Sequence, residues 1–205
     1  TFTAEVVAEV RNRDARYVVD ALSGDLARRH HLVAARGIHQ VDGRRLSRYR
    51  FSHNLFQRYL YQSLDSAERV YLHEAVGNAL EEIYQGQTEE IAGRLARHFE
   101  ETGLLDKAMR YREEAGDAAA RVHATPEAVA QYRQAVQLAR QLDASGEVLN
   151  ELYTRLGRAL ELNSGYDRAM VTYREMEELA RQRDDRSMIL TSLVARLTVH
   201  AVLGT

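Results

Sequence analysis

The feature that most constrains the fold is an internal repeat in the second half of the chain. Residues 150–183 form one full unit, and residues 109–142 form a second copy, offset by one unit plus seven residues. The matched positions hold a small residue, an alanine and a tyrosine: Gly116 and Gly157, Ala128 and Ala169, Tyr132 and Tyr173. Small residues at matched places let paired helices approach closely and stack on the next pair. The repeat therefore predicts an open superhelix of helical pairs, with the seven extra residues drawn out in the connection from Leu142 to Gly146.

Amphipathic periodicity after residue 53 predicts an almost wholly helical region. The chain holds one proline and is rich in alanine, leucine, glutamate and arginine, as a helical protein should be. The expected helices are 54–63, 66–84, 88–101, 105–122, 126–142, 147–163, 166–183 and 186–203. We expect N-caps at Ser66, Thr88, Thr125, Ser145 and Asp185, and left-handed C-caps at Gly86, Gly103 and Gly165.

The segment 1–52 has a different pattern, which predicts a small α/β module. Thr3 and Asp14 can cap two short helices, and residues 31–35 and 48–51 alternate like the strands of a hairpin. A loop holding Gly37 and Gly43 would join these strands. Helix, helix and hairpin in this order describe a winged helix without its usual first helix, so we expect the chain to begin inside a domain. The fold class is thus mostly α: a partial winged helix at 1–52, then a tetratricopeptide-like superhelix at 53–205.

Charge is unevenly distributed along the chain. Residues 1–50 hold ten arginines against six acids, although the whole chain carries a net charge of -2. In a winged helix, the second helix and the wing present arginines to DNA. One interpretation is therefore a DNA-binding site made by Arg28, Arg29, Arg44 and Arg45. Acidic residues interrupt this basic segment, which makes nucleic acid the less favoured partner.

Stacked helical pairs present a groove lined by the first helix of each pair. With Gly116 and Gly157 as references, the residues expected to face it and to bind a protein or peptide are Arg110, Glu113, Asp117, Arg121, Glu151, Thr154, Arg158 and Glu161. Both signs of charge are present. The alternative is that these residues are simply solvated faces of the helices.

The junction between the two modules carries a family resemblance. The run Phe51-Ser52-His53-Asn54-Leu55-Phe56, continued by Arg69-Val70-Tyr71-Leu72-His73, resembles the junction in bacterial signal-transduction ATPases of the STAND type, including those fused to cyclase or LuxR-type output domains. The resemblance implies a winged helix and a helical sensor arm behind an ATPase domain. That domain, with its ATP and magnesium, would lie upstream, because this chain has no phosphate-loop motif and only one lysine, Lys107.

No motif in the sequence points to catalysis or to a metal or other cofactor. The chain has no cysteine, its histidines lack metal-ligand spacing, and its adjacent acids diverge around helices. We therefore expect a non-catalytic interaction arm of a larger regulator, with a DNA-binding regulator dimerised by its helices as the alternative. The apolar last helix, 186–203, would pack against the rest of a larger chain or a second copy. With no run of about 20 apolar residues, we expect no membrane span and a cytoplasmic protein.

Overall fold

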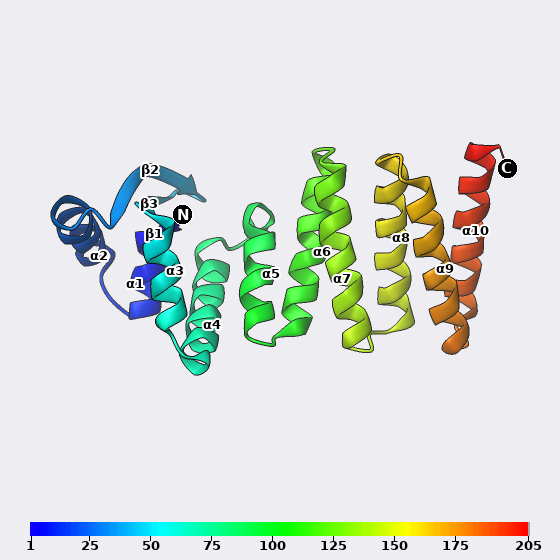
Figure 1. The fold of residues 1–205 in the computed structure, drawn as a ribbon, viewed down its shortest axis with the longest axis horizontal. Coiled ribbons are helices and arrows are strands. Elements are labelled where there is room, and N and C mark those ends of the chain that lie inside the picture. The colour runs from blue at the N-terminus through cyan, green and yellow to red at the C-terminus, as the bar shows by residue number, and fades with distance from the viewer. Residues whose placement is uncertain (205) are drawn as a thin grey trace. The chain divides into compact units, whose positions relative to one another are not determined.

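The structure is a computed structural model, and it describes residues 1–204. The chain is mostly helical and divides into two compact units (Figure 1). The first unit comprises Thr1–Thr88 with His98–Gly103, and the second comprises Glu89–Arg97 with the chain from Leu104 onward. The predicted boundary after Ser52 lies within the first unit.

The first unit begins with a winged-helix-like arrangement, as predicted. Its elements are β1 (Phe2–Thr3), α1 (Ala4–Arg11), α2 (Ala15–Ala21), the π-helical η1 (Leu22–Arg29), β2 (Val33–Val41) and β3 (Arg44–Phe51). The three strands form an antiparallel sheet in the order β1-β3-β2. Side chains from both helices and the sheet form one core, which includes Ala8, Val18, Leu22, Val33 and Tyr49. The predicted cap at Asp14 is present, since its carboxylate accepts from the Arg16 backbone N–H at 2.8 Å.

The hairpin differs from its prediction, because its strands are longer and its loop is shorter. Asp42 and Gly43, with φ of 44° and 75°, make a two-residue turn. Two left-handed residues are typical of the tight turn whose twist matches paired strands. Gly37 lies inside β2, where the register shifts between Ala35 and Ile38. Its φ of 91° suits glycine, so it makes a bulge rather than a loop.

Two further helices belong to the first unit: α3 (Asn54–Ser63) and α4 (Ser66–Ile83). Helix α4 packs against α1. Its N-cap is Asp65 rather than Ser66, because Asp65 accepts from the Glu68 N–H at 2.8 Å and Glu68 accepts from the Asp65 N–H at 3.1 Å. This reciprocal capping box outcompetes the serine. Helix α3 buries none of its residues, and Leu55 is 78% exposed.

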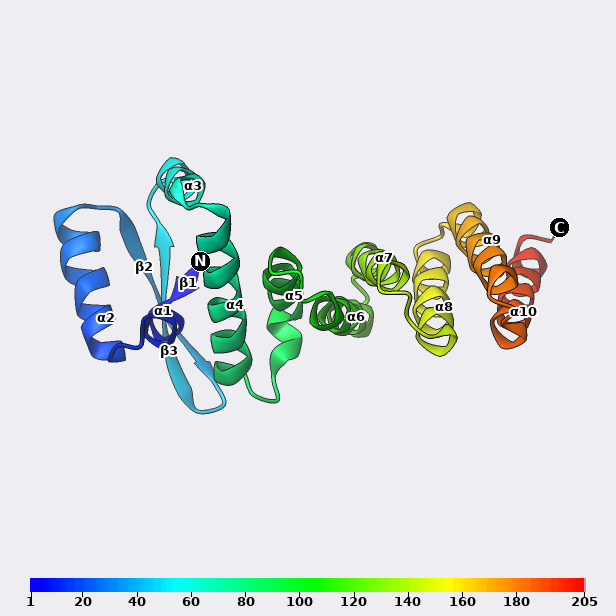
Figure 2. The same ribbon diagram turned by 90° about the horizontal axis from the view of Figure 1, so that it is seen from below.

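The remaining helices form the stack of the second unit. They are α6 (Leu105–Arg121), α7 (Thr125–Gln141), α8 (Gly146–Leu162), α9 (Tyr166–Gln182) and α10 (Arg186–Leu203), while η2 (Thr88–Ile91) and α5 (Ala92–Glu101) are shared with the first unit. From α6 on, each helix packs against the next, and α8 also contacts α10. Figure 2 shows α6, α8 and α10 in one layer and α7 and α9 in the other. This is the predicted open stack, not a bundle around one centre.

The matched glycines lie where paired helices touch. A Cβ on Gly116 would lie 2.5 Å from the Tyr132 ring, and a Cβ on Gly157 would overlap the Tyr173 ring. Real side chains do not approach so closely, so the tyrosines occupy space that only glycine leaves free. One core runs from Ala119 to Val199 through both pairs.

The seven extra residues of the repeat are not in a connection, contrary to the prediction. The helices α6 to α9 each have 17 residues, and four residues separate α7 from α8. Helix α8 begins at Gly146, one residue before its expected start at residue 147. The extra length therefore lengthens the paired helices, which adds buried surface along each seam.

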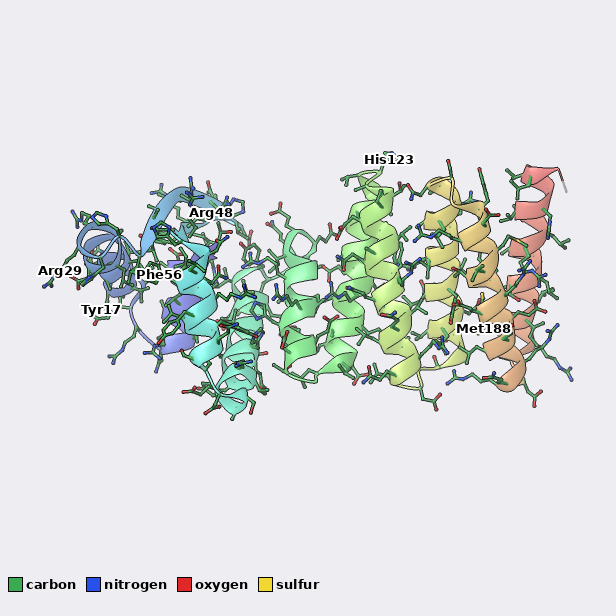
Figure 3. All side chains as sticks on the ribbon, viewed as in Figure 1. Tyr17, Arg29, Arg48, Phe56, His123 and Met188 are labelled. Atoms are coloured by element: carbon green, nitrogen blue, oxygen red, sulfur yellow. The ribbon has the colours of Figure 1, made fainter. Side chains whose placement is uncertain are left out.

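Several helix ends also differ from their predictions. Gly165 has φ of -92° and precedes α9, whereas the left-handed residue is Ser164, with φ of 56°. His123, Asp143 and Asp184 hold the same conformation at the other connections, and Figure 3 shows His123 at the tip of the α6–α7 connection. Small polar residues and histidine tolerate this conformation better than most residues do. Thr125 follows the N-cap residue Ala124 instead of being the cap. The predicted caps at Ser145 and Asp185 and the left-handed Gly86 and Gly103 are confirmed.

Helix α10 is long and apolar enough to span a bilayer, judged by length and composition alone. This differs from the prediction of no membrane span. Leu190 and Leu197 are 63% and 68% exposed, so much of its apolar surface is open. One side of it nevertheless packs on the stack, where Arg196 pairs with the buried Glu177 of α9. That ion pair fits a helix which packs against protein.

Candidate functional site

The predicted groove residues lie on the layer formed by α6 and α8, which we call the α6–α8 face (Figure 2). None of the eight is buried. Those on the open surface are Arg110, Arg121, Glu151, Thr154 and Arg158, and those that are half-buried are Glu113, Asp117 and Glu161. The stack therefore leaves this face accessible along both helices.

Three of the predicted acids converge on Arg155, which was not among the predicted residues. Its guanidinium lies 2.5 Å from the carboxylates of Asp117 and Glu151 and 3.4 Å from that of Glu113. Because Glu113 and Asp117 belong to α6, the arginine ties the two hairpins together. With three acids around one arginine, the cluster keeps a negative excess.

The cluster changes the acidity of its members. Burial raises the pKa of Glu113, the negative charges of Glu151 and Asp117 add to the rise, and Arg155 opposes it. Burial alone would lower the pKa of Arg155, but its hydrogen bonds to Asp117 and Glu151 more than offset this, so the pKa is raised. Arg155 is therefore a permanent cation, and Glu113 holds a proton more readily than an ordinary glutamate does.

Tyr132 and Tyr173, which pack against the matched glycines, also reach this face. The Tyr132 hydroxyl donates to Asp117 at 2.7 Å, and the Tyr173 hydroxyl donates to Glu161 at 2.6 Å. Glu161 also accepts from Arg158 at 2.9 Å. Burial raises the pKa of both tyrosines, and the bonded carboxylates raise it further. Each tyrosine therefore remains a hydrogen-bond donor and fixes one acid of the face.

Two shallow cavities open on the α6–α8 face. One of about 480 Å³ is lined by Asp117, Arg121 and Arg155, with Tyr132 at its base. Arg121 also pairs with Glu89 at 2.6 Å. The other, of about 260 Å³, is mostly apolar, and its lining is Ala120, His123, Thr125, Ala128, Tyr132, Thr154, Arg155, Arg158, Ala159 and Leu162. Six of the eight predicted residues contact Arg155 or line these cavities: Glu113, Asp117, Arg121, Glu151, Thr154 and Arg158. Of the other two, Glu161 pairs with Arg158, and Arg110 does neither.

A local signal for Arg155 was present in the sequence. Glu151 and Arg155 are four residues apart, which is the spacing of a helical ion pair. Glu113 and Asp117 are also four apart on α6, and two acids on one face call for a cation nearby. The sequence alone does not show that α6 and α8 are neighbours in one layer. It therefore does not place Arg155 beside the two acids of α6.

The four arginines of the DNA-binding alternative are all exposed in the first unit. Arg28 and Arg29 end η1, and Arg44 and Arg45 open β3 just after the hairpin turn. Figure 3 marks Arg29 and also the exposed Arg48 of β3. The Arg28 Nε donates to the Ser23 carbonyl at 3.0 Å, which holds its side chain along its own helix.

Comparisons with known proteins add no family to this picture. No protein-family model matches the chain, and no curated protein is similar enough in sequence to count as a relative. Within residues 1–204, no three histidine, aspartate or glutamate side chains are grouped as metal ligands.

Proposed function

We propose that the chain is a non-catalytic, cytoplasmic interaction arm of a larger ATPase-type signalling or transcriptional regulator, and that the α6–α8 face binds a partner protein. The observation that carries this proposal is the open stack, which leaves one layer of helices accessible along its length. Repeat stacks of this kind use such extended faces for recognition.

The chemistry of the face supports a protein partner. Arg155 fixes three acids in place, so the face presents ordered carboxylates rather than mobile ones. Arg121 and Arg158 add positive charge beside them, and the smaller cavity offers apolar surface at Ala128 and Leu162. A partner with both charged and apolar side chains would match this mixture.

A site-specific crosslinker tests the face. A photoreactive amino acid replaces Thr154, which lines the smaller cavity, in the complete protein expressed in its native host. The control places it at Gln134, an exposed position on α7 in the other layer. We expect one discrete adduct from position 154 and not from 134, and Arg158→Glu should abolish it. Equal adducts at both positions would reject this face.

The placement within a larger regulator has its own test. Sequencing the gene on both sides of this segment should reveal an upstream domain with a phosphate-loop motif. A partner such as the one trapped at position 154 should then change the rate of ATP hydrolysis by the complete protein. A gene without any nucleotide-binding domain would remove the ATPase part of the proposal and leave the interaction face standing.

The DNA-binding alternative rests on the four exposed arginines of the winged-helix-like module. Fluorescence anisotropy with a random duplex tests it, because phosphate contacts give an affinity that falls steeply with salt. On this alternative, reversing the charge at Arg28, Arg29, Arg44 and Arg45 abolishes the signal. No binding by the unmodified chain even at low salt would eliminate it.

A further inference from the structure

The other layer of the stack holds a separate cleft, which lies between α7 and α9 with α8 as its floor. Its volume is about 550 Å³, and it shares no lining residue with the two cavities of the α6–α8 face. We call it the α7–α9 cleft. Because α7 and α9 are second helices of successive pairs, the cleft lies where the two pairs meet.

Three arginines line this cleft: Arg133 and Arg140 from α7, and Arg168 from α9. All three are exposed, and none makes an ion pair with another described residue. The lining also includes two acids, Asp167 and Glu175, so positive charge is in excess. Arg155 on the other layer is, by contrast, surrounded by its own acids.

The floor of the cleft contains a buried donor without an acceptor. Tyr153 is 1% exposed, and no acceptor lies within hydrogen-bond distance of its hydroxyl. Burial raises the pKa of Tyr153, Arg140 opposes the rise through its positive charge and a hydrogen bond to the hydroxyl, and Glu175 adds to the rise. Because a guanidinium can only donate, Arg140 leaves the Tyr153 hydroxyl without an acceptor. A buried donor left unsatisfied is rare in folded proteins.

The first helical pair shows what the second one lacks. When Gly116 is matched with Gly157, the position equivalent to Tyr153 is Arg112, whose guanidinium donates to Gln131 at 2.9 Å. Thr172 stands in the place of Gln131, and its hydroxyl donates to its own helix at the Arg168 carbonyl, at 2.9 Å. The polar contact across the first pair is therefore absent from the second, in which no side chain supplies an acceptor for the Tyr153 hydroxyl.

We propose that the α7–α9 cleft binds an acidic peptide segment of a partner protein, with its carboxylates on the three arginines and one of them accepting from the Tyr153 hydroxyl. This is a second site, and it does not rest on the α6–α8 face. The planar guanidinium of arginine can donate two parallel hydrogen bonds to one carboxylate, and such charge-assisted hydrogen bonds are stronger than those between neutral groups.

The spacing of the arginines favours a peptide over a single small anion. Arg133 and Arg140 are seven residues apart on one helix, which separates them by about 10 Å. An extended chain covers about 10 Å in three residues. Val136, Leu156 and Val171 also line the cleft, so an apolar side chain between two acids has a surface to cover.

Selection from a random heptapeptide phage library on the complete chain tests the proposal. The enriched peptides should carry two or more acids separated by apolar residues. This enrichment should vanish on the triple variant R133Q/R140Q/R168Q and persist on Arg174→Gln, an exposed arginine of α9 outside the cleft. Peptides without an excess of acids, or equal enrichment on the triple variant, would overturn the proposal.

Affinity measurements with one enriched, fluorescently labelled peptide then examine the floor and the size of the ligand. Tyr153→Phe keeps the buried ring, so we expect an unchanged circular dichroism spectrum and binding weakened about tenfold. An unchanged affinity would exclude the hydroxyl. Citrate should displace the peptide only at more than about tenfold higher carboxylate concentration. Displacement at equal carboxylate concentration would assign the cleft to a small organic anion and overturn the peptide proposal.

Discussion

The two helical pairs, α6 with α7 and α8 with α9, share one seam and differ in their polar contacts. In both pairs a glycine lets a tyrosine of the next helix lie against its backbone, at matched positions of the repeat. In the first pair Arg112 bonds across to Gln131, but in the second Tyr153 has no such bond. The shared positions therefore maintain the packing, and the differing positions shape the surfaces that are free to bind.

The largest expected effect on stability comes from disrupting the glycine–tyrosine contact that both helical pairs share. Gly157→Ala inserts a methyl group into the Tyr173 ring, so we expect a loss of about 1–3 kcal/mol in the free energy of unfolding, despite the higher helix propensity of alanine. Gly116→Ala should behave alike because it meets Tyr132 in the same way. Urea unfolding followed by circular dichroism measures both.

Gly93→Ala is the matched control for these variants. A Cβ at Gly93 would meet no atom closer than 3.6 Å, at Gln131, so alanine fits there. We expect a gain of up to about 1 kcal/mol from helix propensity alone. If Gly157→Ala stabilises the chain in the same way, the tyrosine contact does not define the seam.

The next effect concerns the link between the two pairs. Arg155→Gln removes the cation from three acids, so we expect a loss of about 1–2 kcal/mol at pH 7, between the values for surface and buried pairs. The loss should shrink at pH 4, because protonated acids repel less. Arg140→Gln, on the unpaired face, should stay within about 0.5 kcal/mol. Equal losses for the two variants would erase the difference between the faces.

The tyrosine hydroxyls of the shared seam should contribute less. Tyr132→Phe and Tyr173→Phe each lose one bond to a carboxylate, so we expect about 0.5–1.5 kcal/mol apiece. Because the folded chain raises the pKa of both tyrosines, their stabilisation is complete below the ordinary value of 10.0 and declines as pH rises above it. Unfolding measured from pH 8 to 11 should therefore show less alkaline destabilisation in the double variant. An identical alkaline profile would contradict the assignment.

The smallest effect separates the two pairs most clearly. Tyr153→Phe removes a buried hydroxyl that has no acceptor, so we expect no loss of stability and a gain of up to about 1 kcal/mol. Thermal unfolding compares it with Tyr173→Phe, which does lose a bond. A cost as large as that of Tyr173→Phe would mean that the Tyr153 hydroxyl is bonded within the chain.

Much of this fold was predictable from local sequence. Amphipathic periodicity located the helices, and the matched glycines and tyrosines identified the pairs that touch. The hairpin was less accurate, because Gly37 reads equally as a loop or a bulge until the register of its partner strand is known. The expected bounds of these helices were close, but the seven extra residues of the repeat were assigned to a connection instead of to the helices, because the pattern at 109–142 marks matched positions and not helix ends.

The candidate sites were predictable only in part. Helical spacing from Gly116 and Gly157 placed the residues of the α6–α8 face, because they belong to single helices. Arg155 and the α7–α9 cleft depend on contacts between different helices, which local periodicity does not show. The missing partner of Tyr153 is a property of packing, and its sequence signal was the change from Arg112 to a tyrosine at the matched position.

The most direct test of the difference between the two faces is side-chain NMR of the arginines in the free chain. Nε and Nη resonances report whether a guanidinium is held or rotates freely. Arg155 should give restricted signals, because carboxylates bind it on two helices, while Arg133, Arg140 and Arg168 should give averaged ones. If the three cleft arginines are as restricted as Arg155 before any ligand is added, the cleft is already satisfied and the account of the two faces is wrong.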